Sequence, residues 1–130
     1  MASFTKDAGR FLKKEESDAM TGAYRERKRK MGINDDECVR SEFFGLDQVM
    51  HLLNQPGCVG LRVHQAKRRE NTDGKPDTEG PLKPRVLLTA VDARGRDMSA
   101  RAAQGGLKDA PEDEISTLGD GRPCPQYCGE

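Results

Sequence analysis

Cysteine and histidine are the residues of this chain best suited to chemistry at a fixed site. Two of the four cysteines, Cys124 and Cys128, lie in the last segment of the chain with three residues between them. These two thiols could bridge each other, or one of them could reach Cys58. A zinc ion could instead gather all three thiols, with His64 or His51 as the fourth ligand.

The spacing of the terminal cysteines leaves several interpretations open. Cys-x-x-x-Cys differs from the Cys-x-x-Cys of zinc knuckles and thioredoxin-like sites, and no second closely spaced pair is present. The thiols are therefore free packing groups, a structural disulfide, a metal site or a catalytic thiol. Residues 1–14 show no apolar signal segment. We therefore expect a cytoplasmic protein, and that compartment disfavours a persistent disulfide.

The basic run at residues 25–30 is the second candidate site. It could contact the phosphates of a nucleic acid. The run lacks interleaved aromatic residues for base stacking, and no helix-turn-helix or RNA-recognition signature frames it. The chain has 22 basic and 22 acidic residues, so its net charge of zero provides no overall attraction to nucleic acid or to an acidic membrane. Pairing between oppositely charged blocks of the chain is the competing interpretation. The candidate residues are Arg25, Arg27, Lys28, Arg29 and Lys30.

The common catalytic motifs are missing from the sequence. It contains no Gly-x-Gly-x-x-Gly, no phosphate-binding Gly-x-x-x-x-Gly-Lys-Ser/Thr, no Gly-x-Ser-x-Gly and no His-Glu-x-x-His. With two histidines, the chain has few groups for acid–base work near neutral pH. We therefore expect a protein that is not an enzyme and has no cofactor, with zinc as the alternative.

The apolar residues that must position any site are concentrated in two windows. Most of the Leu, Ile, Val and Phe residues lie in residues 43–63 and 86–91. Large apolar side chains must come together in space to form a core, so these windows are expected to pack on each other. No apolar run is long enough to cross a membrane.

The first window predicts a short helix and a strand. Leu46, Val49, Met50 and Leu53 share one face of a 3.6-residue period, so a helix is expected over residues 46–54. The Pro-Gly pair at positions 56 and 57 ends it. Residues 58–65 then alternate apolar and polar, which is typical of a strand with one apolar face.

The second window predicts a more buried strand over residues 85–91, paired antiparallel with the first. The connecting residues 67–84 are rich in glycine, proline and charge, so we expect a long, mobile, solvated loop. A helix is also expected over residues 17–30, with Ser17 as its N-cap.

These elements predict an α+β fold, with N-terminal helices packed on a small antiparallel strand pair and an extended C-terminal tail. Residues 1–16 are expected to be an N-terminal arm, helical or flexible, and residues 17–97 a single core domain. Residues 98–130 are expected to be a largely irregular tail that ends in the Cys-x-x-x-Cys segment.

Three segments carry a resemblance to known sequences. They are Gln-Pro-Gly-Cys-Val-Gly at residues 55–60, Val-Asp-x-x-Gly-x-Asp at residues 91–97, and the Cys-Pro-x-Tyr-Cys ending. Together they are similar to a group of small uncharacterised bacterial proteins. The resemblance implies the strand pair and a joint role for Cys58 and the terminal cysteines. It implies no activity, cofactor or partner.

A small core suggests a function that depends on other chains. Two strands alone are marginal in water, and an exposed strand edge favours self-pairing. We therefore expect a protein-binding or assembly module that acts as a homo-oligomer or as a subunit of a larger complex. The alternatives are a thiol-based metal or redox site, and weak nucleic-acid binding through the basic run.

Overall fold

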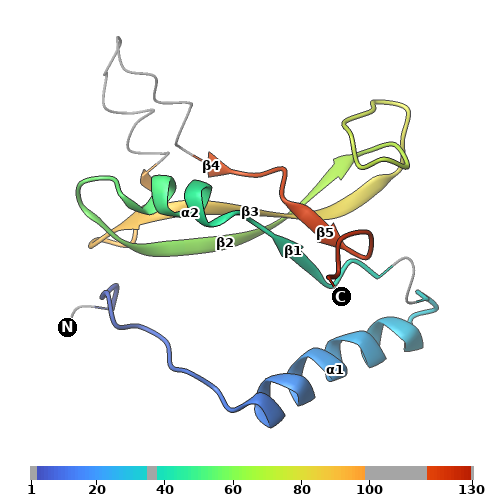
Figure 1. Ribbon diagram of the computed structural model, residues 1–130, viewed down its shortest axis with the longest axis horizontal. Helices are drawn as coiled ribbons and strands as arrows, with labels where there is room; N and C mark the ends of the chain where they lie inside the picture. The colour runs from blue at the N-terminus through green and yellow to red at the C-terminus, as the bar shows by residue number, and fades with distance from the viewer. Residues whose placement is uncertain (1–2, 35–37, 99–116, 130) are drawn as a thin grey trace. The chain divides into compact units, whose positions relative to one another are not determined.

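The computed structural model describes residues 3–34, 38–98 and 117–129, which form an α+β fold with two helices and two small antiparallel sheets (Figure 1). The α+β class expected from the sequence is confirmed. In chain order the elements are α1 (Lys14–Lys30), β1 (Ser41–Phe43), α2 (Leu46–Leu53), β2 (Cys58–Arg69), β3 (Leu82–Asp92), β4 (Thr117–Leu118) and β5 (Arg122–Cys124).

The chain divides into two compact units, the sheet unit and the tail unit. The sheet unit comprises Met1–Ala8 and Phe44–Gly121, and so contains α2, β2, β3 and β4. The tail unit comprises Gly9–Phe43 and Arg122–Glu130, and contains α1, β1 and β5.

The sheet unit is built on the long antiparallel hairpin of β2 and β3, so the strand pair predicted from the sequence is confirmed. The strand order is β2-β3-β4, which places β3 in the centre and β2 at an edge. Leu61 is opposite Ala90 and Val63 is opposite Leu88, so these four side chains share one face of the sheet. Figure 1 shows α2 beside this hairpin.

The hairpin is longer than the sequence predicted. β2 runs to Arg69 and β3 begins at Leu82, so much of the expected loop 67–84 is paired strand. The remaining turn is closed by hydrogen bonds, because the side-chain oxygen of Asn71 accepts from the backbone of Asp73 and of Lys75. Charged residues made this segment look solvated, and the sequence alone does not show their long-range partners.

A small apolar core lies between α2 and the sheet. Leu52, Leu88, Ala90 and Met98 are buried, and Leu118 of β4 is one of the half-buried residues packed on them. The helix was predicted in the correct place, but its buried face was predicted wrongly. Leu46 and Met50 are exposed and Leu52 is the buried residue, because this short helix carries apolar residues on more than one side.

The tail unit has little buried surface in its described residues. Helix α1 begins at Lys14 instead of Ser17, whose hydroxyl donates to the Lys14 carbonyl from inside the first turn. No residue of α1 is buried, so burial gives no support to the expected packing of this helix on the strand pair. The small sheet pairs Ser41 with Cys124 and Phe43 with Arg122.

The C-terminal part was expected to be largely irregular, yet it supplies β4 and β5. Residues 99–116 of that expected tail lie outside the described residues. Neither helix in the described part of the chain has the length and apolarity to span a bilayer.

Candidate functional site

An apolar surface lies along the open edge of the sheet unit. Leu61 and Val63 of β2 are exposed on the face that carries the core residues Leu88 and Ala90. The alternation in β2 was predicted correctly, but its apolar side is the more exposed one. Leu61 and Val63 are called the apolar strip.

The opposite face of β2 carries a polar cluster. Asp97 accepts a hydrogen bond from Arg62 at 2.5 Å, and its other oxygen lies 2.9 Å from His64 Nε2. The same Nε2 lies 3.2 Å from the hydroxyl of the buried Thr89. A hydroxyl–imidazole–carboxylate relay needs the two ring nitrogens to face different partners. Here one nitrogen faces both, so the cluster orders the surface and does not activate Thr89.

The N-terminal segment contacts this same polar cluster. The Phe4 ring lies 5.9 Å from the guanidinium carbon of Arg62, within the range of a cation–π contact. Gly95 makes room for that ring, because a Cβ at this position would come within 2.3 Å of it. The contact secures Arg62 in addition to its bond with Asp97.

A buried ion network lies where the hairpin strands diverge. Glu70 is 1% exposed, and one of its carboxylate oxygens lies 2.9 Å from Arg68 and 3.3 Å from the buried Arg85. Asp120 extends the network, with one oxygen 2.9 Å from Arg68 and 3.6 Å from Arg85. The network neutralises charges that would otherwise be buried without a partner.

Asp120 links the segment after β4 to the hairpin. Its hydrogen bond from Arg68 holds the pKa of the Asp120 carboxyl below its usual value of 3.8. Gly80 is required nearby, because a Cβ there would come within 2.1 Å of the Glu70 carbonyl oxygen. The network accounts for the charged residues near the ends of β2 and β3. Each buried charge in it lies beside an opposite charge. We therefore assign it a structural role.

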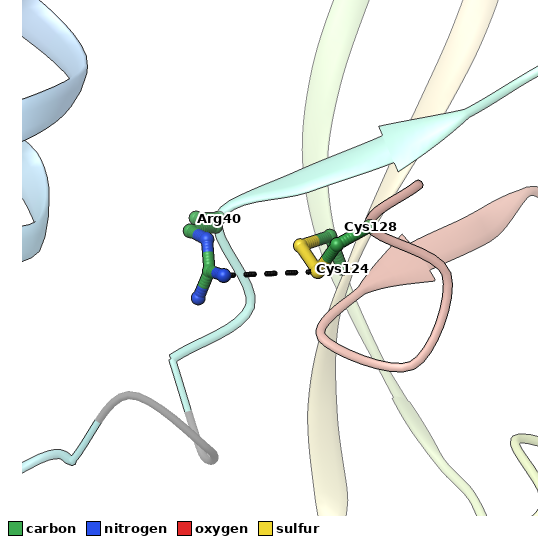
Figure 2. Close-up of a disulfide and its surroundings, with 3 residues drawn as sticks. All are labelled: Arg40, Cys124 and Cys128. Carbon is green, nitrogen blue, oxygen red and sulfur yellow. Dashed lines mark hydrogen bonds between the residues drawn. A yellow bond between two sulfur atoms is a disulfide. The ribbon is translucent and has the colours of Figure 1, made fainter. Parts of the chain in front are cut away.

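The tail unit contains the second candidate site, the disulfide between Cys124 and Cys128. Its two cysteines differ in exposure, because Cys124 is 5% exposed on β5 while Cys128 is exposed beyond it. Figure 2 shows Arg40 beside the bridge, with its Nη2 donating to Cys128 Sγ at 3.7 Å. The Arg40 backbone N–H also donates to the Cys124 carbonyl at 2.9 Å, which fixes Arg40 relative to β5.

An open groove of about 760 Å³ borders this disulfide. The guanidinium of Arg122 lies 5.6 Å from the centre of the Tyr127 ring. The groove therefore combines an exposed cysteine, a cation and an aromatic ring. Its lining residues are Ser41, Glu42, Phe43, Arg122, Gln126, Tyr127, Cys128 and Gly129.

The predicted zinc ligands are distributed over both units. Cys58 is a free thiol of the sheet unit, and its sulfur donates to the Gly60 carbonyl at 3.3 Å. Cys124 and Cys128 are in the tail unit, and the disulfide form does not offer the thiolates that zinc prefers. His64 is occupied by Asp97. The described residues contain no group of three or more side chains placed to hold a metal.

The basic run occupies the last turns of α1, where cations suit the helix dipole. Positions 25, 27, 28, 29 and 30 point around the whole axis of a helix with 3.6 residues per turn, so they do not form one stripe. Lys28 lies over the Tyr24 ring at 5.4 Å, and Arg29 pairs with Glu26 at 3.5 Å. Nucleic-acid binding by this run stays a prediction.

Sequence reasoning missed Arg40, Glu70 and Arg85 as important side chains. Each has a partner that local pattern does not indicate: Arg40 meets Cys128, and Glu70 meets Arg85. No protein-family model, curated protein or solved structure matches this chain.

Proposed function

We propose that this protein is a non-enzymatic assembly module whose sheet unit pairs with a second copy of itself along β2. The observation that carries the proposal is the open edge of β2 beside the exposed Leu61 and Val63. Within the described residues, no strand pairs with this edge. Unpaired edge groups next to exposed apolar side chains favour addition of another strand.

Charge along β2 favours an antiparallel arrangement. The strand ends in the basic residues Lys67, Arg68 and Arg69 and contains no acidic residue. A parallel, in-register pair would place these cations opposite one another, which is destabilising. Antiparallel pairing about a two-fold axis moves them away from each other, and such closed symmetric dimers are the commonest homo-oligomers.

A two-fold axis near Arg62 gives the best match between apolar side chains. It places Leu61 opposite Val63 of the partner subunit, so that the apolar strips of the two copies meet. The two Arg62 side chains would then meet, but each is held by its own Asp97. The basic end of β2 would lie opposite the uncharged residues 55–57 of the partner subunit.

Analytical ultracentrifugation over a wide range of concentrations tests the proposal. We expect a monomer–dimer equilibrium that the Val63→Lys variant shifts to monomer without changing the far-UV circular dichroism. Leu82→Lys is the matched control, because Leu82 is 54% exposed and Val63 is 53% exposed on the same hairpin. A wild-type chain that is monomeric at every concentration would refute self-assembly. A different protein bound at β2 would then be the remaining form of the assembly hypothesis.

A further inference from the structure

We propose that the Cys124–Cys128 disulfide of the tail unit is a thiol–disulfide exchange site, at which a thiol that carries carboxylates attacks Cys128. The inference is independent of self-assembly through β2, because all of its residues belong to the tail unit. It rests on the unequal exposure of the two cysteines, on the position of Arg40, and on the groove beside Cys128.

Access decides which sulfur is attacked. Exchange requires an incoming thiolate to reach a disulfide sulfur in line with the S–S bond. Cys124 is 5% exposed and is held within β5, whereas Cys128 is exposed. An external thiol therefore reaches Cys128 first, and Cys124 is the leaving group.

The electron balance is that of an ordinary two-step exchange. The first thiolate bonds to the Cys128 sulfur, and the electron pair of the broken bond leaves on Cys124, which takes a proton from water. A second thiolate then attacks the sulfur of the first thiol and releases Cys128 as a thiolate. The protein disulfide gains two electrons, and the two external thiols become one disulfide.

Arg40 acts at the Cys128 sulfur. Its guanidinium donates to that sulfur at 3.7 Å, and a neighbouring cation stabilises a thiolate. The same cation therefore favours release of Cys128 in the second step and favours the reduced form of the site. Arg40 is a positioning and electrostatic residue of the exchange, and it forms no bond to the external thiol.

The groove indicates the class of thiol. Its size of about 760 Å³ lies within the usual range for small-ligand sites, and Arg122 in its lining offers a cation to a carboxylate. A small thiol that carries carboxylates therefore fits the groove better than a neutral thiol does.

The first test uses the wild-type chain and glutathione as the probe. The oxidised protein is treated with limiting glutathione, quenched with acid, and mapped by mass spectrometry. We expect the mixed disulfide on Cys128 in at least tenfold excess over Cys124. Equal labelling, or labelling of Cys124, would overturn the proposal.

A matched pair of variants separates the effect of access to each cysteine from the effect of losing the disulfide. Cys124→Ser and Cys128→Ser each remove the same disulfide and leave one of its sulfurs free. We expect the Cys128 thiol of Cys124→Ser to form a mixed disulfide with oxidised glutathione at least tenfold faster than the Cys124 thiol of Cys128→Ser. Equal rates, read by peptide mapping so that Cys38 and Cys58 do not contribute, would contradict the assigned order of attack.

Charge variants test Arg40 and the groove. We expect Arg40→Gln to slow reduction of the wild-type disulfide by glutathione roughly two- to fivefold, the range of an exposed charge interaction. Arg29→Gln is the matched control, because Arg29 pairs with Glu26 on α1. An equal effect of both variants, or no effect of either, would remove Arg40 from the mechanism.

The ligand class is tested by comparing glutathione with 2-mercaptoethanol at equal thiolate concentration. We expect glutathione to react roughly two- to fivefold faster, and Arg122→Gln to abolish that preference. Equal rates for the two thiols with the unchanged chain would show that the groove does not recognise carboxylates.

Discussion

The sheet unit and the tail unit are stabilised by different means. In the sheet unit, apolar packing around Leu52 lies at one part of the hairpin and the ion network around Glu70 at another. In the tail unit, α1 buries no residue, and the small sheet is three residues long on each strand. The buried residues described there are Cys38 and Cys124, and the latter belongs to the disulfide.

The difference shows how a covalent bond substitutes for a core. Small folded elements that bury little apolar area need a covalent cross-link. The conformational entropy lost on ordering the chain exceeds the free energy that their packing contributes. The sheet unit has packing and charge pairing to offset that cost. A change in one unit should therefore leave the other unit as an internal reference.

The largest effect is expected from Glu70→Ala in the sheet unit. The change leaves the buried Arg85 without its closest carboxylate, and breaking a buried pair in this way costs about 3–5 kcal/mol. Chemical denaturation followed by circular dichroism measures the loss. Glu79→Ala is the control, because Glu79 is exposed in the same turn, and an equal loss in both variants would contradict the role of the network.

Leu52→Ala is expected to reduce the unfolding free energy by about 3 kcal/mol, because it leaves a cavity in the apolar core. Met50→Ala on the same helix removes an exposed side chain and should cost far less. Amide hydrogen exchange should accelerate in β3 and remain unchanged in β1. Acceleration in both strands would show that the two units unfold together.

Removing the disulfide is expected to act on the tail unit alone. Closing so short a loop stabilises by about 2 kcal/mol on the chain-entropy account, and Cys128→Ser loses that contribution. The amides of Ser41–Phe43 should exchange faster, while those of β2 and β3 keep their rates. Cys58→Ser is the control, since it removes a free thiol from the sheet unit.

The smallest effect is expected from the pH dependence of Asp120. Its folded pKa lies below its ordinary value of 3.8, so its stabilising contribution is complete above that value and is lost as pH falls through the folded pKa. Asp120 is exposed, so the contribution is below about 1 kcal/mol. The difference in stability between wild type and Asp120→Asn should shrink on acidification below pH 4 and be larger at pH 6. A constant difference would argue against the pairing with Arg68.

Local pattern was enough to predict the elements that depend on neighbouring residues. The period of Leu46 to Leu53 located α2, and the Pro-Gly pair ended it. The alternation after Cys58 located β2, and the apolar run at residues 85–91 located its antiparallel partner β3. Periodicity did not show which face is buried, because that depends on where Leu88 and Met98 arrive in space.

The remaining features depend on contacts between distant residues. The sequence alone predicts Arg68 to be a solvated loop cation. In the structure it pairs with Glu70 and Asp120. Nothing in the sequence around Arg40 indicates a partner. The pairing of β1 with β5 brings Cys128 beside it. The terminal cysteines could be identified from their spacing as a candidate disulfide, but their unequal exposure could not.

The segment 117–124 contributes a strand to each of the two sheets, with Asp120 between them. During synthesis on the ribosome, neither sheet can therefore be completed until this late segment has emerged from the exit tunnel. Strand β4 is therefore added to the hairpin, and strand β5 to β1, only after those earlier parts have been made.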